Sequence, residues 1–243
     1  MMPSVVIIAG GAATRLRPVT ETVPKALLMV AGKPFIAHQL LLLRKNGIKK
    51  IVICSGRLSK QIEDFVSDGS EFGLSVTFSV DGEKLLGTGG AVKKALPLLE
   101  EEFFVMYGDS YLTVHFNDVY DYFRAYSGMG LMTVFKNRNT RGNSNIVFKG
   151  GKIITYDKKN KMEEMDYIDY GLGILKKTAF DAMAAKEIFD LSELYQDIIS
   201  KKQMSAYEVS ERFYEIGSLS GLAETERYIL GRNLSSRWSK ARE

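Results

Sequence analysis

Three cations that follow two glycines are the residues of this chain best placed to do chemistry. The glycines are Gly10 and Gly11, the cations are Arg15, Arg17 and Lys25, and Pro18 and Pro24 lie among the cations. Glycines let backbone N–H groups approach an anion closely, and a guanidinium fork and an ammonium group neutralise its oxygens. The prolines prevent one regular helix from spanning the stretch. We therefore expect a loop that binds phosphate groups.

The commonest phosphate-binding motifs are absent from this stretch. The residues after Gly10 do not give G-x-G-x-x-G, and no G-x-x-x-x-G-K-[ST] occurs, which disfavours a dinucleotide-binding fold and a P-loop ATPase. The run from Gly10 to Lys25 instead closely resembles the G-G-x-x-T-R-L-x-P-x-T…P-K signature of the sugar-1-phosphate nucleotidylyltransferases, also called nucleoside-diphosphate-sugar pyrophosphorylases. The alternative interpretation is a basic surface loop after a core strand.

The resemblance implies roles for individual residues of the loop. Arg15 would stabilise the leaving pyrophosphate, and Lys25 would hold phosphates, including that of the sugar phosphate. The residues implied to contact the nucleotide here are Ala9, Gly10, Gly11, Thr14 and Arg15.

A second glycine-rich segment reads Gly87-Thr88-Gly89-Gly90 and precedes a predicted helix. Glycines at a helix N-terminus leave bare backbone where a polar ligand edge can dock. The family has a G-T-x-G segment at this place that touches the nucleoside, which implies nucleotide contacts for Gly87, Thr88 and Gly89. The alternative is a loop that needs glycines only to turn.

Two acidic residues are candidate ligands of Mg²⁺. Asp109 ends a buried strand, where ligands of open α/β sheets gather, and its carboxylate is a hard oxygen ligand. The family has its G-D here, with the aspartate on the metal, and also W-x-D-I-G-T, where this chain has Tyr214-Glu215-Ile216-Gly217. The resemblance therefore implies Asp109 as a catalytic metal ligand, with Glu215 as the second ligand in place of the family's aspartate. A surface strand residue is the alternative for Glu215.

The residues expected to hold the sugar phosphate depart more from the family pattern. A lysine of the family that contacts the sugar phosphate corresponds to Lys158 or Lys159. The family's x-N-x-G becomes Asp169-Tyr170-Gly171, and an aspartate accepts hydrogen bonds from hydroxyls but does not donate them. A region that often reads R-Y-G ends here in Asn145. With Lys25, the implied contacts are Asn145, Lys158, Asp169 and Gly171.

The implied reaction joins an NTP and a sugar 1-phosphate to give an NDP-sugar and pyrophosphate, with Mg²⁺ as cofactor. The attacking phosphate is already ionised near neutral pH, so neither a protein nucleophile nor a general base is needed. The pattern looks most like small bacterial enzymes that use GTP with D-glycero-D-manno-heptose 1-phosphate or mannose 1-phosphate. Alternatives are a CTP- or UTP-dependent enzyme acting on another sugar phosphate or on phosphocholine, and a nucleotide-sensing regulatory subunit without turnover.

The elements that must position these residues alternate along the first half of the chain. Apolar runs predict strands at 5–8, 49–56, 74–80 and 102–109, with helices at 34–47, 59–68 and after residue 87. Such repeated units predict an α/β protein with a doubly wound, mostly parallel, Rossmann-like sheet. The second half of the chain does not continue this alternation of strands and helices. Its predicted strands are 130–136, 144–149, 152–157 and 167–175, its helices are 117–126, 191–200 and 217–231, and Gly150-Gly151 predicts a hairpin.

Composition limits the remaining possibilities. The 243 residues, 45% of them hydrophobic, fit a single domain, with a nucleotide-binding half at 1–111, a sugar-phosphate half at 112–232 and a basic tail at 233–243. A net charge of +4 without a basic stripe disfavours nucleic-acid binding. No signal peptide or long apolar run is present, so we expect a cytoplasmic protein that does not bind membranes. The sequence allows a homo-oligomer. The single cysteine, Cys54, is expected to be a buried strand thiol.

Overall fold

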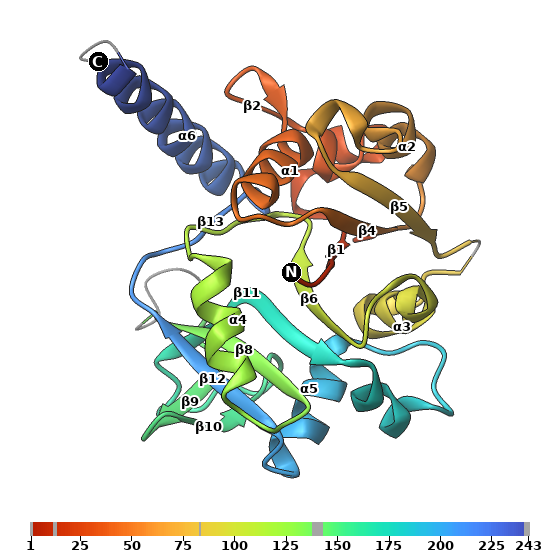
Figure 1. The fold of residues 1–243 in the computed structure, drawn as a ribbon, viewed down its shortest axis with the longest axis vertical. Helices are drawn as coiled ribbons and strands as arrows, with labels where there is room; N and C mark the ends of the chain where they lie inside the picture. The colour runs from red at the N-terminus through yellow and green to blue at the C-terminus, as the bar shows by residue number, and fades with distance from the viewer. Residues whose placement is uncertain (1, 12–13, 83, 138–142, 241–243) are drawn as a thin grey trace.

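The computed structural model describes residues 2–11, 14–82, 84–137 and 143–240 of the chain. A nine-stranded mixed sheet runs through it (Figure 1). The parallel part has the order β6-β1-β4-β5. Its strands are β1 (Val5–Ile8), β4 (Lys50–Ser55), β5 (Ser75–Val80) and β6 (Glu102–Tyr107). All four were predicted from their apolar runs.

Helices cover both faces of this sheet, because successive strand side chains point to opposite faces. Val5 and Ile7 belong to a core that includes side chains of α1, α2 and α4. Val6 and Ile8 belong to a second core with side chains of α3 and α5. The helices are α1 (Phe35–Lys45), α2 (Ser59–Val66), α3 (Gly87–Ala95), α4 (Phe116–Arg124) and α5 (Leu191–Ser200). The doubly wound α/β prediction is confirmed.

The second half of the chain adds antiparallel strands to the same sheet. β11 (Tyr167–Lys176) pairs antiparallel with both β6 and β8 (Gly130–Lys136). β9 (Ile146–Lys149) and β10 (Lys152–Tyr156) form the predicted hairpin, in which Gly150 and Gly151 have φ of 58° and 75°. Only glycine adopts two successive positive φ angles without strain, so the Gly-Gly pair determines this turn.

Four short strands and one longer strand were not predicted. β12 (Met204–Val209) pairs parallel with β8. β2 (Met29–Val30) pairs with β3 (Lys33–Pro34), and β7 (Ser110–Tyr111) pairs with β13 (Tyr214–Glu215). A strand of two residues is too short to show an alternating apolar pattern in the sequence. Its formation therefore depends on contacts between distant segments.

The C-terminal helix α6 (Leu219–Lys240) is longer than the predicted 217–231 segment and projects away from the body (Figure 1). Its first turns pack against the β2–β3 hairpin through a small core of Val30, Phe35, Ile216 and Ile229. The helix thereby ties the end of the cationic loop to the segment that carries Glu215.

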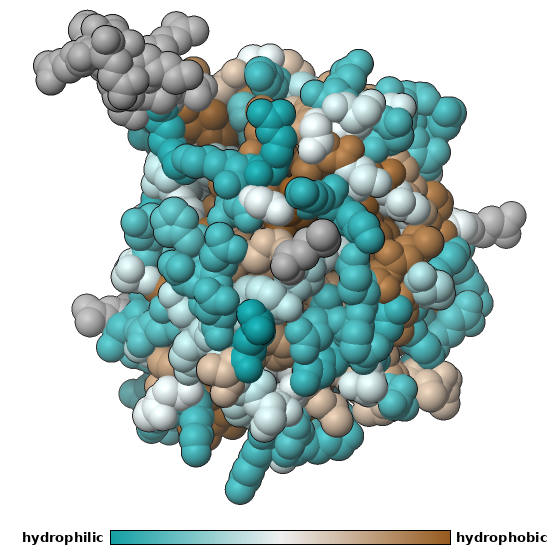
Figure 2. Space-filling model, in the orientation of Figure 1, coloured by the Kyte–Doolittle hydropathy of each residue, from teal (hydrophilic) through white to brown (hydrophobic). Residues whose placement is uncertain are grey.

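Polar side chains cover most of the face shown in Figure 2. Within the described parts of the chain, no helix is both long enough and apolar enough to cross a membrane. Cys54 is buried as expected, and burial raises the pKa of its thiol to about 12.

Candidate active site

Two cavities meet at the carboxyl end of β6. The larger has a volume of about 590 Å³ and the smaller about 180 Å³, and Tyr107 and Asp109 line both. The smaller cavity is lined by Ile8, Ala9, Gly11, Lys25, Ala26, Thr88, Tyr107, Gly108 and Asp109. The larger cavity also borders Arg15, Ser110, Asn145, Lys158, Ile168, Asp169, Arg212, Phe213, Glu215, Ser218, Ser220, Gly221 and Glu224. Asp109 therefore faces two adjoining spaces, as a group placed between two substrates would.

The position of Asp109 depends on a close backbone approach at the preceding residue. A Cβ atom on Gly108 would lie 2.8 Å from the carbonyl oxygen of Ile8, and the Gly108 amide donates to that oxygen at 2.9 Å. Only glycine fits here. The Lys25 ammonium lies 2.9 Å from Asp109 Oδ2, and both side chains are partly buried. The loop cation and the strand-end carboxylate, far apart in sequence, thus form an ion pair.

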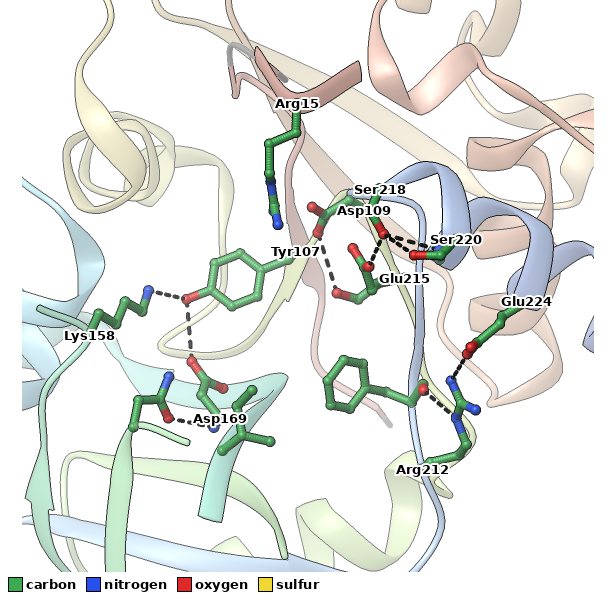
Figure 3. A pocket seen from close by; sticks show the side chains of 15 residues that line it. Arg15, Tyr107, Asp109, Lys158, Asp169, Arg212, Glu215, Ser218, Ser220 and Glu224 are labelled. Atoms are coloured by element: carbon green, nitrogen blue, oxygen red, sulfur yellow. Dashed lines mark hydrogen bonds and ion pairs between the residues drawn. The ribbon is translucent and has the colours of Figure 1, made fainter. Parts of the chain in front are cut away.

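The cationic loop supplies one cation to each cavity. Lys25 and Gly11 line the smaller cavity, together with Ala9, whereas Arg15 lines the larger. Figure 3 shows Arg15 pointing into the larger cavity above Tyr107. Gly10 packs closely on the neighbouring strand end, because a Cβ atom at this position would lie 3.3 Å from the amide nitrogen of Gly56.

Thr14 lies in a short 3₁₀ helix, Thr14–Leu16. Its side chain falls outside the described part of the structure, as do Ala12 and Ala13 of the signature. The nucleotide contact expected of Thr14 remains a prediction.

The second glycine segment packs tightly against residue 189. A Cβ on Gly89 would lie 2.3 Å from the ring of Phe189, and one on Gly87 2.5 Å from its carbonyl oxygen. That oxygen also accepts a hydrogen bond from the Gly89 amide at 3.0 Å. Of the segment, Thr88 lines the smaller cavity. Close packing thus accounts for Gly87 and Gly89, and their contact with the nucleotide stays a prediction.

A two-residue ladder brings Glu215 next to Asp109. Glu215 pairs with Ser110, and the Ile216 amide donates to the Asp109 carbonyl oxygen at 3.0 Å. The Glu215 carboxylate accepts hydrogen bonds from the Gly217 amide and, at 3.2 Å, from the Ser218 hydroxyl. Both carboxylates line the larger cavity (Figure 3).

The carboxylates of Asp109 and Glu215 offer the oxygen ligands that suit Mg²⁺. No cluster of three or more His, Cys, Asp or Glu residues suited to a metal occurs among the described residues. Mg²⁺ does not need one, because it commonly keeps several waters and takes one or two protein carboxylates plus phosphate oxygens. Each carboxylate oxygen also has more than one acceptor site, so the hydrogen bonds to Glu215 leave room for a metal.

A chain of polar groups that includes Tyr107, Lys158 and Asp169 lines another part of the larger cavity. Lys158 donates to the Tyr107 hydroxyl at 3.3 Å, and the hydroxyls of Tyr107 and Tyr156 donate to Asp169 at 3.4 and 3.3 Å. Removal from solvent raises the pKa of Asp169, against the opposing effects of Lys158, the Gly171 amide and the two phenols. Of the two candidate lysines, Lys158 borders the cavity.

Asn145 and Gly171 shape this part of the cavity. Asn145 lines the cavity, and its side-chain oxygen accepts from the Asp169 amide at 3.1 Å. Gly171 has φ of 98° within a register shift of β11, and its amide donates to Asp169 Oδ1 at 3.0 Å. The positive φ explains the glycine and turns Asp169 toward the cavity. Direct contact of Asn145, Asp169 and Gly171 with a sugar remains a prediction.

Sequence reasoning missed one wall of the larger cavity. Arg212 donates to Glu224 at 2.6 Å, and its guanidinium lies 4.2 Å from the ring centre of Tyr214. Both Arg212 and Glu224 line the cavity. Arg212 comes just before the Tyr214–Gly217 motif, so its position in the sequence could have suggested a site residue. Glu224 lies in a helix whose sequence contains no motif that points to a site. Tyr107 was not among the predicted site residues, although its hydroxyl joins Lys158 to Asp169.

A parallel sheet whose strand ends carry a glycine-rich cationic loop, with one carboxylate shared by two cavities, defines a nucleotidyltransferase. The chain belongs to the nucleotidyl transferase family, whose family model matches residues 4–231. It is 27% identical to an N-acetylmuramate alpha-1-phosphate uridylyltransferase of Neisseria meningitidis, over 90% of this chain and 95% of that protein. It is also 27% identical to a D-glycero-alpha-D-manno-heptose 1-phosphate guanylyltransferase of Campylobacter jejuni, over 87% of this chain and 93% of that protein.

Other curated relatives are longer. The chain spans 64% of a UTP–glucose-1-phosphate uridylyltransferase of Synechocystis and 60% of a mannose-1-phosphate guanyltransferase of Saccharomyces cerevisiae. Among solved structures, a Bacillus anthracis protein assigned as a glucose-1-phosphate thymidylyltransferase superposes with a TM-score of 0.84 at 21% identity, covering 93% of this chain and 94% of that one. These relatives share the fold but differ in base and sugar.

Proposed function

We propose that the protein transfers a nucleotidyl group from an NTP to a sugar 1-phosphate, releasing pyrophosphate. The observation that carries this proposal is the pair of cavities that share Asp109, with Lys25 in one and Arg15 in the other. Two anionic substrates can then meet beside a carboxylate and two cations. All lining residues of the smaller cavity belong to the N-terminal half, 1–111, and this cavity would take the nucleotide, whose triphosphate would extend past Asp109 to Arg15 in the larger cavity. The remainder of the chain supplies most of the larger cavity, which would take the sugar phosphate.

In the reaction a phosphate oxygen of the sugar 1-phosphate attacks the α-phosphorus in line. A new O–P bond forms while the bond to the β-phosphate oxygen breaks, and pyrophosphate leaves with that electron pair. Arg15 presents a bidentate guanidinium to the departing charge. Lys25 holds phosphate oxygens at the shared edge of the cavities, where its ammonium already neutralises Asp109. Such catalysis is positioning plus charge stabilisation.

Asp109 and Glu215 would hold Mg²⁺, which when bound supplies positive charge to the phosphates. Asp109 is kept in place by the Gly108 approach to β1 and by the β7–β13 ladder. Lys158 would contact the sugar phosphate, and Asp169 would accept hydrogen bonds from sugar hydroxyls in the larger cavity.

Among substrates we propose GTP with heptose 1-phosphate or mannose 1-phosphate. Similarity to guanylyltransferases for both sugars supports this choice. The uridylyltransferase relative, which the chain covers to 95%, makes UTP the alternative donor.

The test incubates the protein with each of the four NTPs, Mg²⁺ and a panel of sugar 1-phosphates that includes N-acetylmuramate 1-phosphate, with phosphocholine as a non-sugar acceptor. Pyrophosphate release and the nucleotide product are followed. We expect release only when both substrates are present, fastest with GTP and a manno-configured sugar. Release with UTP alone among the nucleotides would overturn the base assignment. NTP binding with no release for any pair would favour a regulatory subunit.

A further inference from the structure

Gln39 is a polar side chain in the buried face of α1 that lines neither cavity. Gln39 is fully buried, with 0% of its surface exposed. Its neighbours on the helix face that packs on the sheet are apolar, among them Ile36, Leu40 and Leu43. An amide at such a position loses its water, so its place in the core calls for a specific partner.

Gln39 reaches the segment that carries Asp109 and binds it on both sides. Its side-chain nitrogen donates to the carbonyl oxygen of Tyr107 at 3.0 Å and to that of Ser110 at 2.8 Å. Both partners are acceptors, so the nitrogen, which has two donor hydrogens, must be the end that faces them. One side chain thus spans the turn from residue 107 to residue 110 and bridges its two ends.

The other end of the same amide is left without a partner. Gln39 Oε1 is buried and accepts no hydrogen bond from the described residues. A buried acceptor without a donor costs free energy, so an apolar residue of the same shape would avoid that cost. An apolar residue would, however, leave the carbonyl oxygens of Tyr107 and Ser110 without this donor, so the two hydrogens aimed at the turn explain the glutamine.

The proposed function requires the turn from residue 107 to residue 110 to stay in a fixed position. Gly108 approaches β1 closely, the Asp109 carbonyl oxygen accepts from the Ile216 amide, and the Asp109 carboxylate faces both cavities. Gln39 bonds both ends of this turn without lining either cavity. A ligand carboxylate held by supporting hydrogen bonds pays less to bind a metal ion than one on a mobile turn.

We propose that Gln39 is a positioning residue that fixes the 107–110 turn and so holds the Asp109 carboxylate where the two cavities meet. For its effect on metal binding, this inference rests on the proposed function, because it takes Asp109 as the ligand. Its effect on the turn does not depend on any ligand.

The test compares Gln39→Met, which keeps the length but removes both donors, and Gln39→Glu, which keeps the shape but replaces the donors with acceptors. Asn46→Leu is the matched control. Asn46 follows the same helix and bridges it to another segment, donating to Leu42 at 3.0 Å and accepting from the Phe116 amide at 3.1 Å. It lines neither cavity.

The first measurement is hydrogen exchange of the protein without ligands. We expect the amides of residues 108–111 to exchange about tenfold faster or more in Gln39→Met than in the wild type, with melting temperatures within about 3 °C, and Asn46→Leu to leave these amides unchanged. Unchanged exchange at 108–111 in both Gln39 variants would overturn the proposal. So would an equal increase in Asn46→Leu, because Gln39 would then be one of many core contacts.

The second measurement is the affinity for Mn²⁺, a probe with the same preference for oxygen ligands, followed by electron paramagnetic resonance. We expect Gln39→Met to bind Mn²⁺ about tenfold more weakly than the wild type, the smaller end of what loss of a supporting partner costs a metal site. Faster exchange with unchanged Mn²⁺ affinity would overturn the metal part of the inference. If Asp109→Asn bound Mn²⁺ as well as the wild type, the proposed role of Asp109 would fail, while the exchange result would still decide the role of Gln39.

Discussion

The two cavities are built in different ways. The smaller one is lined by residues between Ile8 and Asp109, most of which lie at or just after the ends of the parallel strands β1 and β6. The larger one collects residues from Arg15 to Glu224, and most of its polar groups are charged side chains or tyrosines that bind one another. Most of its walls come from β11, β13, α6 and the segment after β10. These segments do not belong to the alternating strands and helices of the first half of the chain.

This difference separates two tasks. A nucleotide donor offers the same triphosphate whatever its base, and a cavity of glycine backbone and one lysine can serve that common part. An acceptor must be recognised by its hydroxyls, which requires placed donors and acceptors such as Lys158 and Asp169. We therefore expect substitutions in the smaller cavity to act on every substrate pair, and substitutions of such polar groups in the larger one to act on the acceptor.

The strongest test of this comparison is Lys25→Ala. We expect kcat to fall about a hundredfold or more, since loss of one charge-stabilising donor commonly costs that much. The melting temperature should change little, because Lys25 lies outside the apolar core, at the start of the 3₁₀ helix Lys25–Leu27, and its partly exposed ion pair with Asp109 contributes little stability. The control is Arg17→Ala: Arg17 lies in the same loop, pairs with Glu21 at 3.8 Å and lines neither cavity. Activity within threefold of wild type for Lys25→Ala would remove its assigned role, as would an equal loss for Arg17→Ala.

Substitutions of Asp109 and of Glu215 should change the dependence of the reaction rate on Mg²⁺ concentration in the same way. We expect Asp109→Asn and Glu215→Gln each to raise the Mg²⁺ concentration for half-maximal rate about tenfold, and Glu215→Asp to be milder because it keeps the charge. The double variant should be less than additive, since both groups act on one ion. The measurement is the initial rate against Mg²⁺ concentration. If Glu215→Gln changed the melting temperature but not the Mg²⁺ requirement, Glu215 would be structural.

A smaller effect is expected from the ion pair that supports Lys158. Asp190 caps α5, accepts from Thr88 at 3.0 Å and lies 3.7 Å from the Lys158 ammonium. Burial raises the pKa of Asp190, but hydrogen bonds from Ser192 and the charge of Lys158 outweigh it, so the net pKa is lowered.

Asp190→Asn keeps an acceptor oxygen for the Ser192 amide of the cap but removes the negative charge. Its amide nitrogen can donate to the Thr88 hydroxyl, in place of the bond that Asp190 accepts from that hydroxyl. We expect the KM for the sugar phosphate to rise about threefold and the KM for the NTP to stay unchanged, because partly exposed ion pairs contribute little. Glu193→Gln is the control, since Glu193 belongs to the same capping box and pairs with Lys186. Equal changes in both KM values would contradict the division of labour between the cavities.

The mildest test concerns Asp169, whose pKa burial raises. Because the folded state holds the proton more tightly, this carboxyl contributes stability below its unfolded pKa of about 4 and that contribution is lost as the pH rises through the folded value. Asp169→Asn carries no titrating proton. Its melting temperature relative to wild type should therefore increase as the pH is raised from 4 to 8. A difference that does not vary with pH would mean that Asp169 is not perturbed.

Much of the parallel half could be predicted from the sequence. Apolar runs such as Val5–Ile8 and the helix that starts after Pro34 carry strong local signals, and Gly150-Gly151 determines its own turn. The motifs also predicted Arg15, Lys25 and Asp109 as site residues, and all three line a cavity, because the loop after β1 and the residues after β6 lie at the same edge of the sheet.

The tertiary structure decided the rest. Glu215 meets Asp109 only through a ladder of two residues, Lys158 rather than Lys159 borders the cavity, and Arg212 and Glu224 form a wall of it. Nothing in the sequence around Gln39 predicts that its side chain bonds the carbonyl oxygens of Tyr107 and Ser110. Local sequence determines which residues form a strand or a turn, since backbone preference and burial act over a few neighbours. Contacts between segments a hundred residues apart have no local pattern, so only the packed chain determines them.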